Sequence, residues 1–120
     1  MALRVLIVDD HAHFRRRARR MLELDGLEVV GEAEDGASAV AAARELAPDL
    51  VLLDIQLPDE SGFDVAPRVV DCADPAPVVV LTSTRDLADF APLVERSGAA
   101  GFVHKSELSG AALAELAPAG

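Results

Sequence analysis

Carboxylates end two of the apolar runs in this chain. Asp54 follows the run 50–53, and the pair Asp9-Asp10 follows the run 3–8. If both runs are neighbouring strands of a parallel sheet, their carboxyl ends meet at one edge and bring the three carboxylates together. Such a group needs a cation, because like charges repel. Oxygen ligands without Cys or His ligand spacing favour Mg²⁺ or Mn²⁺ over Zn²⁺.

Further polar side chains follow the later apolar runs. Thr82 and Ser83 come after the run 78–81, and Lys105 comes shortly after 101–103. Beside a cation, a lysine can neutralise one phosphate oxygen and a threonine hydroxyl can donate to another. Asp54 is then free to attack phosphorus as a carboxylate nucleophile and form an acyl phosphate. The protein's part in such a transfer is mainly positioning and charge neutralisation.

Strand and helix patterns alternate five times between these positions. Crossovers of this length predict an α/β fold, a flavodoxin-like doubly wound sandwich. Its five-stranded parallel sheet has the order 2-1-3-4-5, with helices on both faces. Asp35 is the expected N-cap of the second helix, and Pro67 and Pro92 fall within the third and fourth. We expect strands at 3–8, 27–32, 50–53, 78–81 and 101–103, and helices at 14–24, 36–46, 62–72, 88–96 and from Ser109 to Pro118.

Composition limits the class of protein. The 120 residues suffice for one domain, 1–120, and 51% are hydrophobic. The net charge of −10 argues against direct nucleic-acid binding. The single cysteine, Cys72, fits a reducing compartment. No run is long enough to span a membrane and no leader pattern opens the chain, so we expect a cytoplasmic protein without membrane contact.

Five of the eleven cationic residues lie between His11 and Arg20. Phe14, Ala18, Met21 and Leu22 recur at helical spacing and give this segment one apolar face. The arginines then form either an ordinary solvated face or a docking face for an acidic partner helix, and both interpretations stay open.

Four segments resemble the receiver domain of two-component response regulators. They are Val-Asp-Asp (8–10), Leu-Asp-Ile-Gln-Leu-Pro-Asp-Glu-Ser-Gly (53–62), Val-Leu-Thr-Ser (80–83) and Gly-Phe-Val-His-Lys (101–105). The likeness covers essentially the whole chain. It implies a switch rather than a classical enzyme: a sensor histidine kinase donates its phosphoryl group to Asp54, and the domain catalyses both this transfer and the later dephosphorylation.

The resemblance also implies roles for individual residues. Asp10 and Asp54 would ligate Mg²⁺ or Mn²⁺ directly, together with the backbone carbonyl of Gln56, and Asp9 would act through a water. The Gln56 side chain, two positions beyond Asp54, is a candidate for reaching the water that attacks the acyl phosphate.

The same resemblance assigns the phosphoryl-binding and switching groups. Thr82 and Lys105 would hold the phosphoryl group, and Phe102 would move with Thr82 on activation. A homodimer would form through the fourth helix, fifth strand and fifth helix.

Two positions depart from the family pattern. The family usually has a cis proline after the lysine, but Ser106 stands there, and a cis bond before a non-proline residue costs roughly 2.5–4 kcal/mol. Either the loop is rearranged or its surroundings force the strain. Pro92 predicts a fourth helix that starts late or is partly unwound.

The segment 105–110 resembles receivers of the LuxR/NarL type, which usually carry a helix-turn-helix DNA-binding domain downstream. The chain is then either a stand-alone receiver or part of a longer protein. In the second case the expected output is transcription, controlled through a DNA-binding domain that these 120 residues do not contain.

Three other functions compete with the switch. One is an interaction module of the same fold that does not need phosphate, favoured by Ser106 and the irregular fourth helix. Another is a small phosphohydrolase, disfavoured because Gln56 stands where that class has a second Asp as general acid. Flavin binding is weaker still, since no phosphate-binding loop follows the first strand. His11 and His13 are expected in the first turn of their helix, facing water, rather than on a metal.

Overall fold

The computed structural model describes residues 2–117, apart from the side chain of Leu87. Within this range, five strands alternate with five α-helices, and two short 3₁₀ turns flank the last strand and the fourth helix. The elements are β1 (Arg4–Val8), α1 (Ala12–Leu24), β2 (Glu28–Ala33), α2 (Gly36–Leu46), β3 (Leu50–Asp54), α3 (Gly62–Asp71), β4 (Val78–Ser83), η1 (Leu87–Asp89), α4 (Ala91–Arg96), β5 (Gly101–His104), η2 (Lys105–Glu107) and α5 (Gly110–Leu116).

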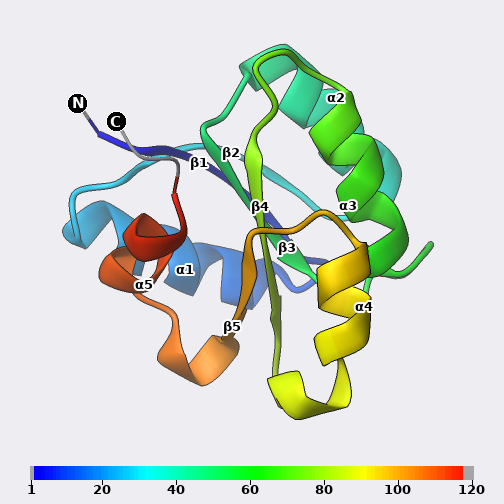
Figure 1. Cartoon of the computed structure of the whole chain (residues 1–120). Coiled ribbons are helices and arrows are strands. Elements are labelled where there is room, and N and C mark those ends of the chain that lie inside the picture. The colour runs from blue at the N-terminus through cyan, green and yellow to red at the C-terminus, as the bar shows by residue number, and fades with distance from the viewer. Residues whose placement is uncertain (1, 118–120) are drawn as a thin grey trace.

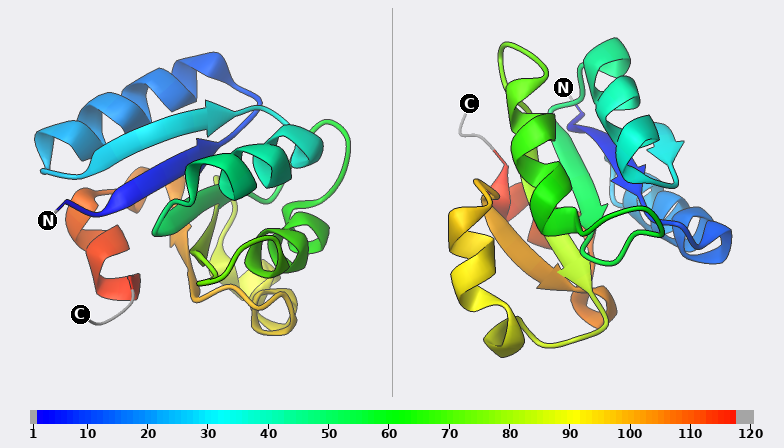
Figure 2. Two further views of the ribbon diagram at one scale, coloured as in Figure 1. Left: turned by 90° about the horizontal axis from the view of Figure 1, so that it is seen from above. Right: turned by 90° about the vertical axis from the view of Figure 1, so that its right-hand side faces the viewer.

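The strands form one parallel sheet in the order β2-β1-β3-β4-β5, which confirms the predicted flavodoxin-like topology. Helices α1 and α5 cover one face, and α2, α3 and α4 cover the other (Figures 1 and 2). The order reverses between β1 and β3, so the carboxyl ends of these two central strands border the crevice where such sheets bind ligands.

Two apolar cores lie on the two faces of the sheet. Alternate side chains of one strand enter different cores, as Leu6 and Val8 pack towards α2 and α3 while Val5 and Ile7 pack towards α1 and α5. The central strands are buried on both faces, which explains why their sequences are continuous apolar runs without polar alternation.

Side-chain caps start three of the helices. Asp35 accepts from the backbone N–H of Ser38 at 2.8 Å and forms a capping box with it, as predicted. Ser61 accepts from Phe63 N at the start of α3, and Ser109 accepts from Ala112 N at the start of α5. The expected end of α5 at Pro118 lies outside the described residues.

The prolines act differently in α3 and α4. Pro67 lies inside α3 and is exposed, so the helix continues through it and the ring stays clear of the core. Pro92 is the second residue of α4, where a helix needs no backbone donor. The fourth helix therefore begins at Ala91 rather than at 88, and only six residues follow the 3₁₀ turn η1. The late start is confirmed.

The Lys105–Ser106 peptide is trans, since the one cis bond within residues 2–117 joins Asp74 and Pro75. The chain turns through η2 after β5, and the ring of His104 closes this turn. Its Nδ1 accepts from the backbone N–H of Ser106 at 3.1 Å, and its Nε2 lies 2.7 Å from the carbonyl oxygen of Thr84. Of the two alternatives left by Ser106, the rearranged loop is the one observed.

No helix in the described part of the chain combines the length and the apolar character needed to cross a membrane.

Candidate functional site

Strand register brings the acidic residues together. Val8 pairs with Leu53, so the next residues, Asp9 and Asp54, lie side by side where β1 and β3 end. Both carboxylates are buried, Asp9 completely and Asp54 with 4% of its surface exposed. The expected meeting of strand-end carboxylates at one edge of the sheet is therefore present.

Lys105 reaches this edge from the end of β5, an outer strand of the sheet. Its Nζ lies 2.6 Å from Asp9 Oδ2 and 3.2 Å from Asp54 Oδ2, and its side chain is largely buried. The ammonium also lies 4.3 Å from the centre of the Phe14 ring, which presents its face to the charge. One cation thus bridges two carboxylates that would otherwise repel each other.

The loop after β3 fixes the orientation of the Asp54 carboxylate. The Gln56 backbone N–H donates to Asp54 Oδ1 at 3.0 Å, while the Gln56 side chain is exposed. Gly62 lets α3 begin directly against the strand end, because a Cβ there would lie 2.4 Å from the Asp54 carbonyl oxygen and 2.8 Å from Ile55 Cα. The loop 55–62 is closed at its base, where the Gly62 N–H donates to the Ile55 carbonyl oxygen at 2.7 Å.

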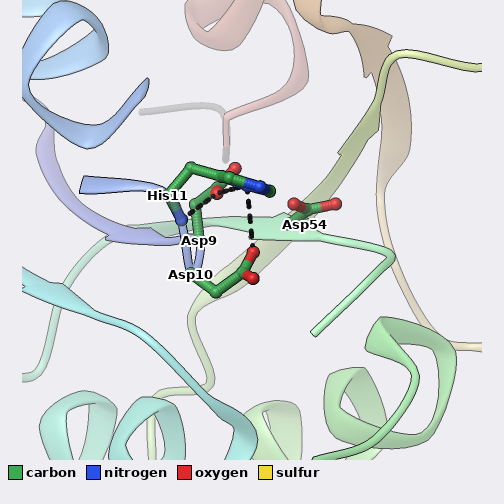
Figure 3. A group of neighbouring side chains, drawn as sticks. All are labelled: Asp9, Asp10, His11 and Asp54. Atoms are coloured by element: carbon green, nitrogen blue, oxygen red, sulfur yellow. Dashed lines mark hydrogen bonds and ion pairs between the residues drawn. The ribbon is translucent and has the colours of Figure 1, made fainter. Parts of the chain in front are cut away.

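Asp10 and His11 complete the cluster on its solvent side (Figure 3). Ligand atoms from Asp9, Asp10, His11 and Asp54 all lie within 4.8 Å of one another. Three carboxylates and one imidazole at this spacing are suited to holding a divalent cation. The donor set thus fits the metal that the sequence predicts.

Electrostatics differ between the two buried carboxyl groups. Burial raises the pKa of Asp54 to about 6, and the neighbouring Asp9 charge adds to the rise despite the Gln56 N–H and Lys105. Burial also opposes ionisation of Asp9, but the hydrogen bond from Lys105 and the His11 N–H outweigh it and lower the pKa of Asp9. The pKa of Lys105 is raised, because its contacts with Asp9 and Asp54 exceed the effect of burial. Of the two buried carboxyl groups, Asp54 is thus the one that is harder to ionise.

Neither Thr82 nor Phe102 contributes a side chain to this cluster. Thr82 pairs with Asp54 in the sheet and is fully buried, yet its Oγ1 donates to the carbonyl oxygen of Val103 at 2.7 Å. The half-buried Phe102 packs near Phe90, with ring centres 6.5 Å apart. Thr82 and Ser83 are the last residues of β4 rather than the first of a loop, as strand pairing with β5 extends past Leu81.

Both histidines face water as expected, but His11 precedes the first turn of its helix instead of lying in it. His11 is the N-cap of α1, and its Nδ1 lies 3.1 Å from both Asp9 Oδ1 and Asp10 Oδ1. The helix begins two residues earlier than its apolar spacing indicates, which puts His11 against the acidic pair and leaves His13 exposed within the helix.

Two other contacts were missed. Arg15 donates from Nη1 to the Asp9 carbonyl oxygen at 2.5 Å while its Nε binds Glu32, and Phe14 packs against Lys105. The sequence indicated these contacts only through position, because Phe14 and Arg15 lie in the first turn of α1, shortly after the acidic pair. Phe14 was assigned simply to the apolar face and Arg15 to the arginine-rich one.

Comparison with known proteins agrees with this geometry. Residues 5–116 match the family model of the response regulator receiver domain. The chain is 42% identical over 104 residues to BvgA of Bordetella pertussis, named for positive transcription regulation of virulence factors. It is 38% identical over 118 residues to the response regulator GacA of Pseudomonas viridiflava. These alignments cover 87% and 98% of this chain but 49% and 53% of the relatives, so the chain spans about half their length.

A solved structure shows the same fold. The signal receiver domain of the response regulator NarL from Mycobacterium tuberculosis superimposes with a TM-score of 0.82 at 36% identity, over 96% of both chains. Fold and site thus define a switch domain of the two-component signalling type. The chain belongs to the response regulator receiver domain family and is similar to its NarL/LuxR-type members.

Proposed function

We propose that this receiver accepts a phosphoryl group on Asp54 from the phosphohistidine of a sensor histidine kinase, in a reaction that requires Mg²⁺ or Mn²⁺. The observation that carries the proposal is Lys105 Nζ, held 3.2 Å from Asp54 Oδ2 at a buried sheet edge that three carboxylates share. A lysine in this place can exchange a carboxylate for a phosphoryl oxygen without moving far.

Four residues supply the ligands in this proposal. Asp10, Asp54 and the backbone carbonyl of Gln56 would hold the cation directly, and Asp9 would act through a water. The bound cation neutralises charge on the phosphoryl group and on the carboxylates.

The chemical step uses the buried carboxylate. An Asp54 oxygen attacks phosphorus while the N–P bond of the phosphohistidine breaks. The electron pair of the broken N–P bond stays on the imidazole nitrogen. The Gln56 N–H keeps the carboxylate oriented during the attack, and Lys105 offsets the phosphoryl charge. Positioning and charge neutralisation account for most of the effect, as expected for phosphoryl transfer. The exposed Gln56 side chain stays the candidate for contacting the water that later removes the phosphoryl group.

The switch follows from the present direction of Thr82. Its hydroxyl donates to Val103 O, so binding a phosphoryl oxygen requires it to turn from β5 towards Asp54. That movement opens space beside β5, into which the Phe102 ring is proposed to move from its place near Phe90. The change would reach the surface formed by α4, β5 and α5, where we propose a homodimer contact.

The output proposed for this switch is transcription. BvgA is named as a transcription regulator, and both compared relatives extend well beyond the region matched here. A DNA-binding region outside residues 1–120 would carry that output, since the receiver's own charge of −10 disfavours DNA contact.

Phosphorylation of the purified chain by acetyl phosphate with Mg²⁺ tests the proposal. Intact-mass measurement is expected to show one added phosphoryl group in wild type and in Asp64→Asn, an exposed carboxylate of α3 that serves as control. Asp54→Asn is expected to show none, and chelation of the metal should abolish labelling. Absence of labelling in wild type, or full labelling of Asp54→Asn, contradicts the proposal.

A further inference from the structure

An imidazole lies among the carboxylates of the acidic cluster. His11 Nδ1 lies 3.1 Å from Asp9 Oδ1 and 3.1 Å from Asp10 Oδ1, so it is positioned between the two carboxylates of the adjacent pair (Figure 3). Within residues 2–117, this ring is the nitrogen ligand that comes within 4.8 Å of the carboxylates of Asp9, Asp10 and Asp54. Its proximity has to be explained by something other than helix capping, because the side chain caps no backbone group of α1.

The spacing of these atoms matches that of neighbouring ligands on one metal. Bonds of roughly 2.1 Å at right angles place two ligand atoms about 3 Å apart. The distance from His11 Nδ1 to Asp10 Oδ1, the carboxylate that would bind the cation directly, agrees with that value. The same distance also suits an ordinary hydrogen bond from a ring N–H, so the experiment must separate the two accounts.

Backbone contacts hold the ring of His11 in this position. The His11 N–H donates to Asp9 Oδ1 at 2.8 Å, and the residue has extended backbone angles as the N-cap of α1. Arg15, one turn further, contacts the Asp9 carbonyl. Both contacts bind the first helical turn to Asp9 at the end of β1, and in this arrangement the ring of His11 lies beside Asp10.

We propose that His11 Nδ1 is a direct ligand of the cation in this site and makes the site select first-row transition cations over Mg²⁺. Mg²⁺ prefers oxygen ligands and releases its waters reluctantly, whereas imidazole suits the later divalent metals. An added nitrogen ligand therefore strengthens Co²⁺ binding far more than Mg²⁺ binding. The inference rests on the proposed function, since it concerns the same cation site.

Titration calorimetry with Co²⁺ and with Mg²⁺ tests this selectivity on wild type, His11→Ala and His13→Ala. His13 is the matched control, because it is an exposed histidine two residues away in α1. The measured Co²⁺ affinity includes only the Co²⁺ that excess Mg²⁺ displaces. Co²⁺ bound to other histidines is thereby left out of the measured affinity. His11→Ala is expected to weaken this Co²⁺ binding at least tenfold and to change Mg²⁺ binding less than twofold, while His13→Ala changes neither.

Pulsed electron paramagnetic resonance of bound Mn²⁺ gives a readout independent of affinity. Coupling to an imidazole nitrogen is expected in wild type and in His13→Ala and absent in His11→Ala. A wild-type spectrum without this coupling, or equal loss of Co²⁺ and Mg²⁺ binding in His11→Ala, overturns the role of His11 and leaves the phosphorylation proposal standing. If no cation binds competitively with Mg²⁺, and phosphorylation of Asp54 also fails, both proposals are overturned together.

Discussion

The carboxyl edge of the sheet and the α4 region differ in how many independent contacts hold them. At the edge, Asp54 is placed by strand register, by the Gln56 N–H and by Lys105, and Gly62 packs against its backbone. The α4 region consists of a 3₁₀ turn, a helix of six residues without a side-chain cap, and Val94 as the one buried side chain of that helix. Both regions belong to the same fold, yet only the carboxyl edge is held in place by several independent contacts.

This difference separates chemistry from signalling. A phosphoryl-transfer site needs groups held in one arrangement, because misplacement costs rate. A segment that changes conformation must instead belong to the part of the molecule that opens at low free energy. The short α4 and the side-chain hydrogen bond from Thr82 Oγ1 to β5 fit the second requirement. The two regions should therefore respond differently to equal perturbations.

Adding one methyl group at a glycine is expected to produce the largest contrast. Gly62→Ala places a Cβ against the backbone of Asp54 and Ile55, which cannot yield as a flexible side chain would, and should cost about 3 kcal/mol or more. Gly98→Ala, just after α4, meets open space and suffers only from its φ of +82°, so it should cost roughly 1 kcal/mol. Urea unfolding of both variants measures the difference.

A shifted site is a second expected result of Gly62→Ala. Phosphorylation of the folded fraction should fall, because Asp54 moves relative to Lys105, whereas Gly98→Ala should be labelled like wild type. Equal destabilisation by both substitutions would show that the edge tolerates movement as well as α4 does.

The two regions also differed in how far sequence alone could predict them. The site depended on strand ends, and buried parallel strands are recognisable as short apolar runs, so Asp9, Asp54 and Lys105 were found. Helix starts are weaker signals. The spacing of Phe14, Ala18 and Leu22 predicted a helix that starts at Phe14, whereas α1 begins at Ala12. Because of this difference, the contact of His11 with Asp10 was not predicted.

Side-chain directions were beyond sequence for a different reason. The sequence placed Thr82 at the correct edge of the sheet. It could not show the direction of the hydroxyl, because the same threonine at the same position can bind Val103 O, as observed, or point towards Asp54. The turn η2 after β5 is likewise closed by a side chain, the ring of His104, whose Nδ1 accepts from the Ser106 N–H. Such choices are made by tertiary contacts and not by local pattern.

Removing the charge of Asp54 is the next perturbation in size and should stabilise the metal-free domain. Because burial raises the pKa of Asp54 in the folded state to about 6 from an ordinary 3.8, the folded domain holds this proton more tightly than the unfolded chain does. Stability is therefore lost as pH rises from about 4 to about 6 and stays lower above it. Asp54→Asn should recover up to about 3 kcal/mol at pH 7.5.

Unfolding in urea with a chelator, from pH 5 to pH 8, measures this effect. The gain from Asp54→Asn should grow with pH and level off above pH 6, and Mg²⁺ should stabilise wild type more than the variant. The matched Asp64→Asn should follow wild type, because that carboxylate is exposed. If Asp54→Asn is less stable than wild type throughout, the ion pair with Lys105 outweighs desolvation and the edge is held by charge rather than by packing.

Truncating one valine in each region should produce the smallest contrast and compares packing alone. Val65 in α3 and Val94 in α4 belong to the same core, the first fully buried and the second 8% exposed. Val65→Ala should cost about 2 kcal/mol because its neighbours cannot collapse into the space, and Val94→Ala about 1 kcal/mol because a six-residue helix can shift to fill it. Amide exchange should show the same order, with α4 opening faster than α3 in wild type and nearly unprotected in Val94→Ala. Equal costs, with α4 as protected as α3, would mean that the fourth helix is as firmly packed as the site and that the signal leaves the domain by another route.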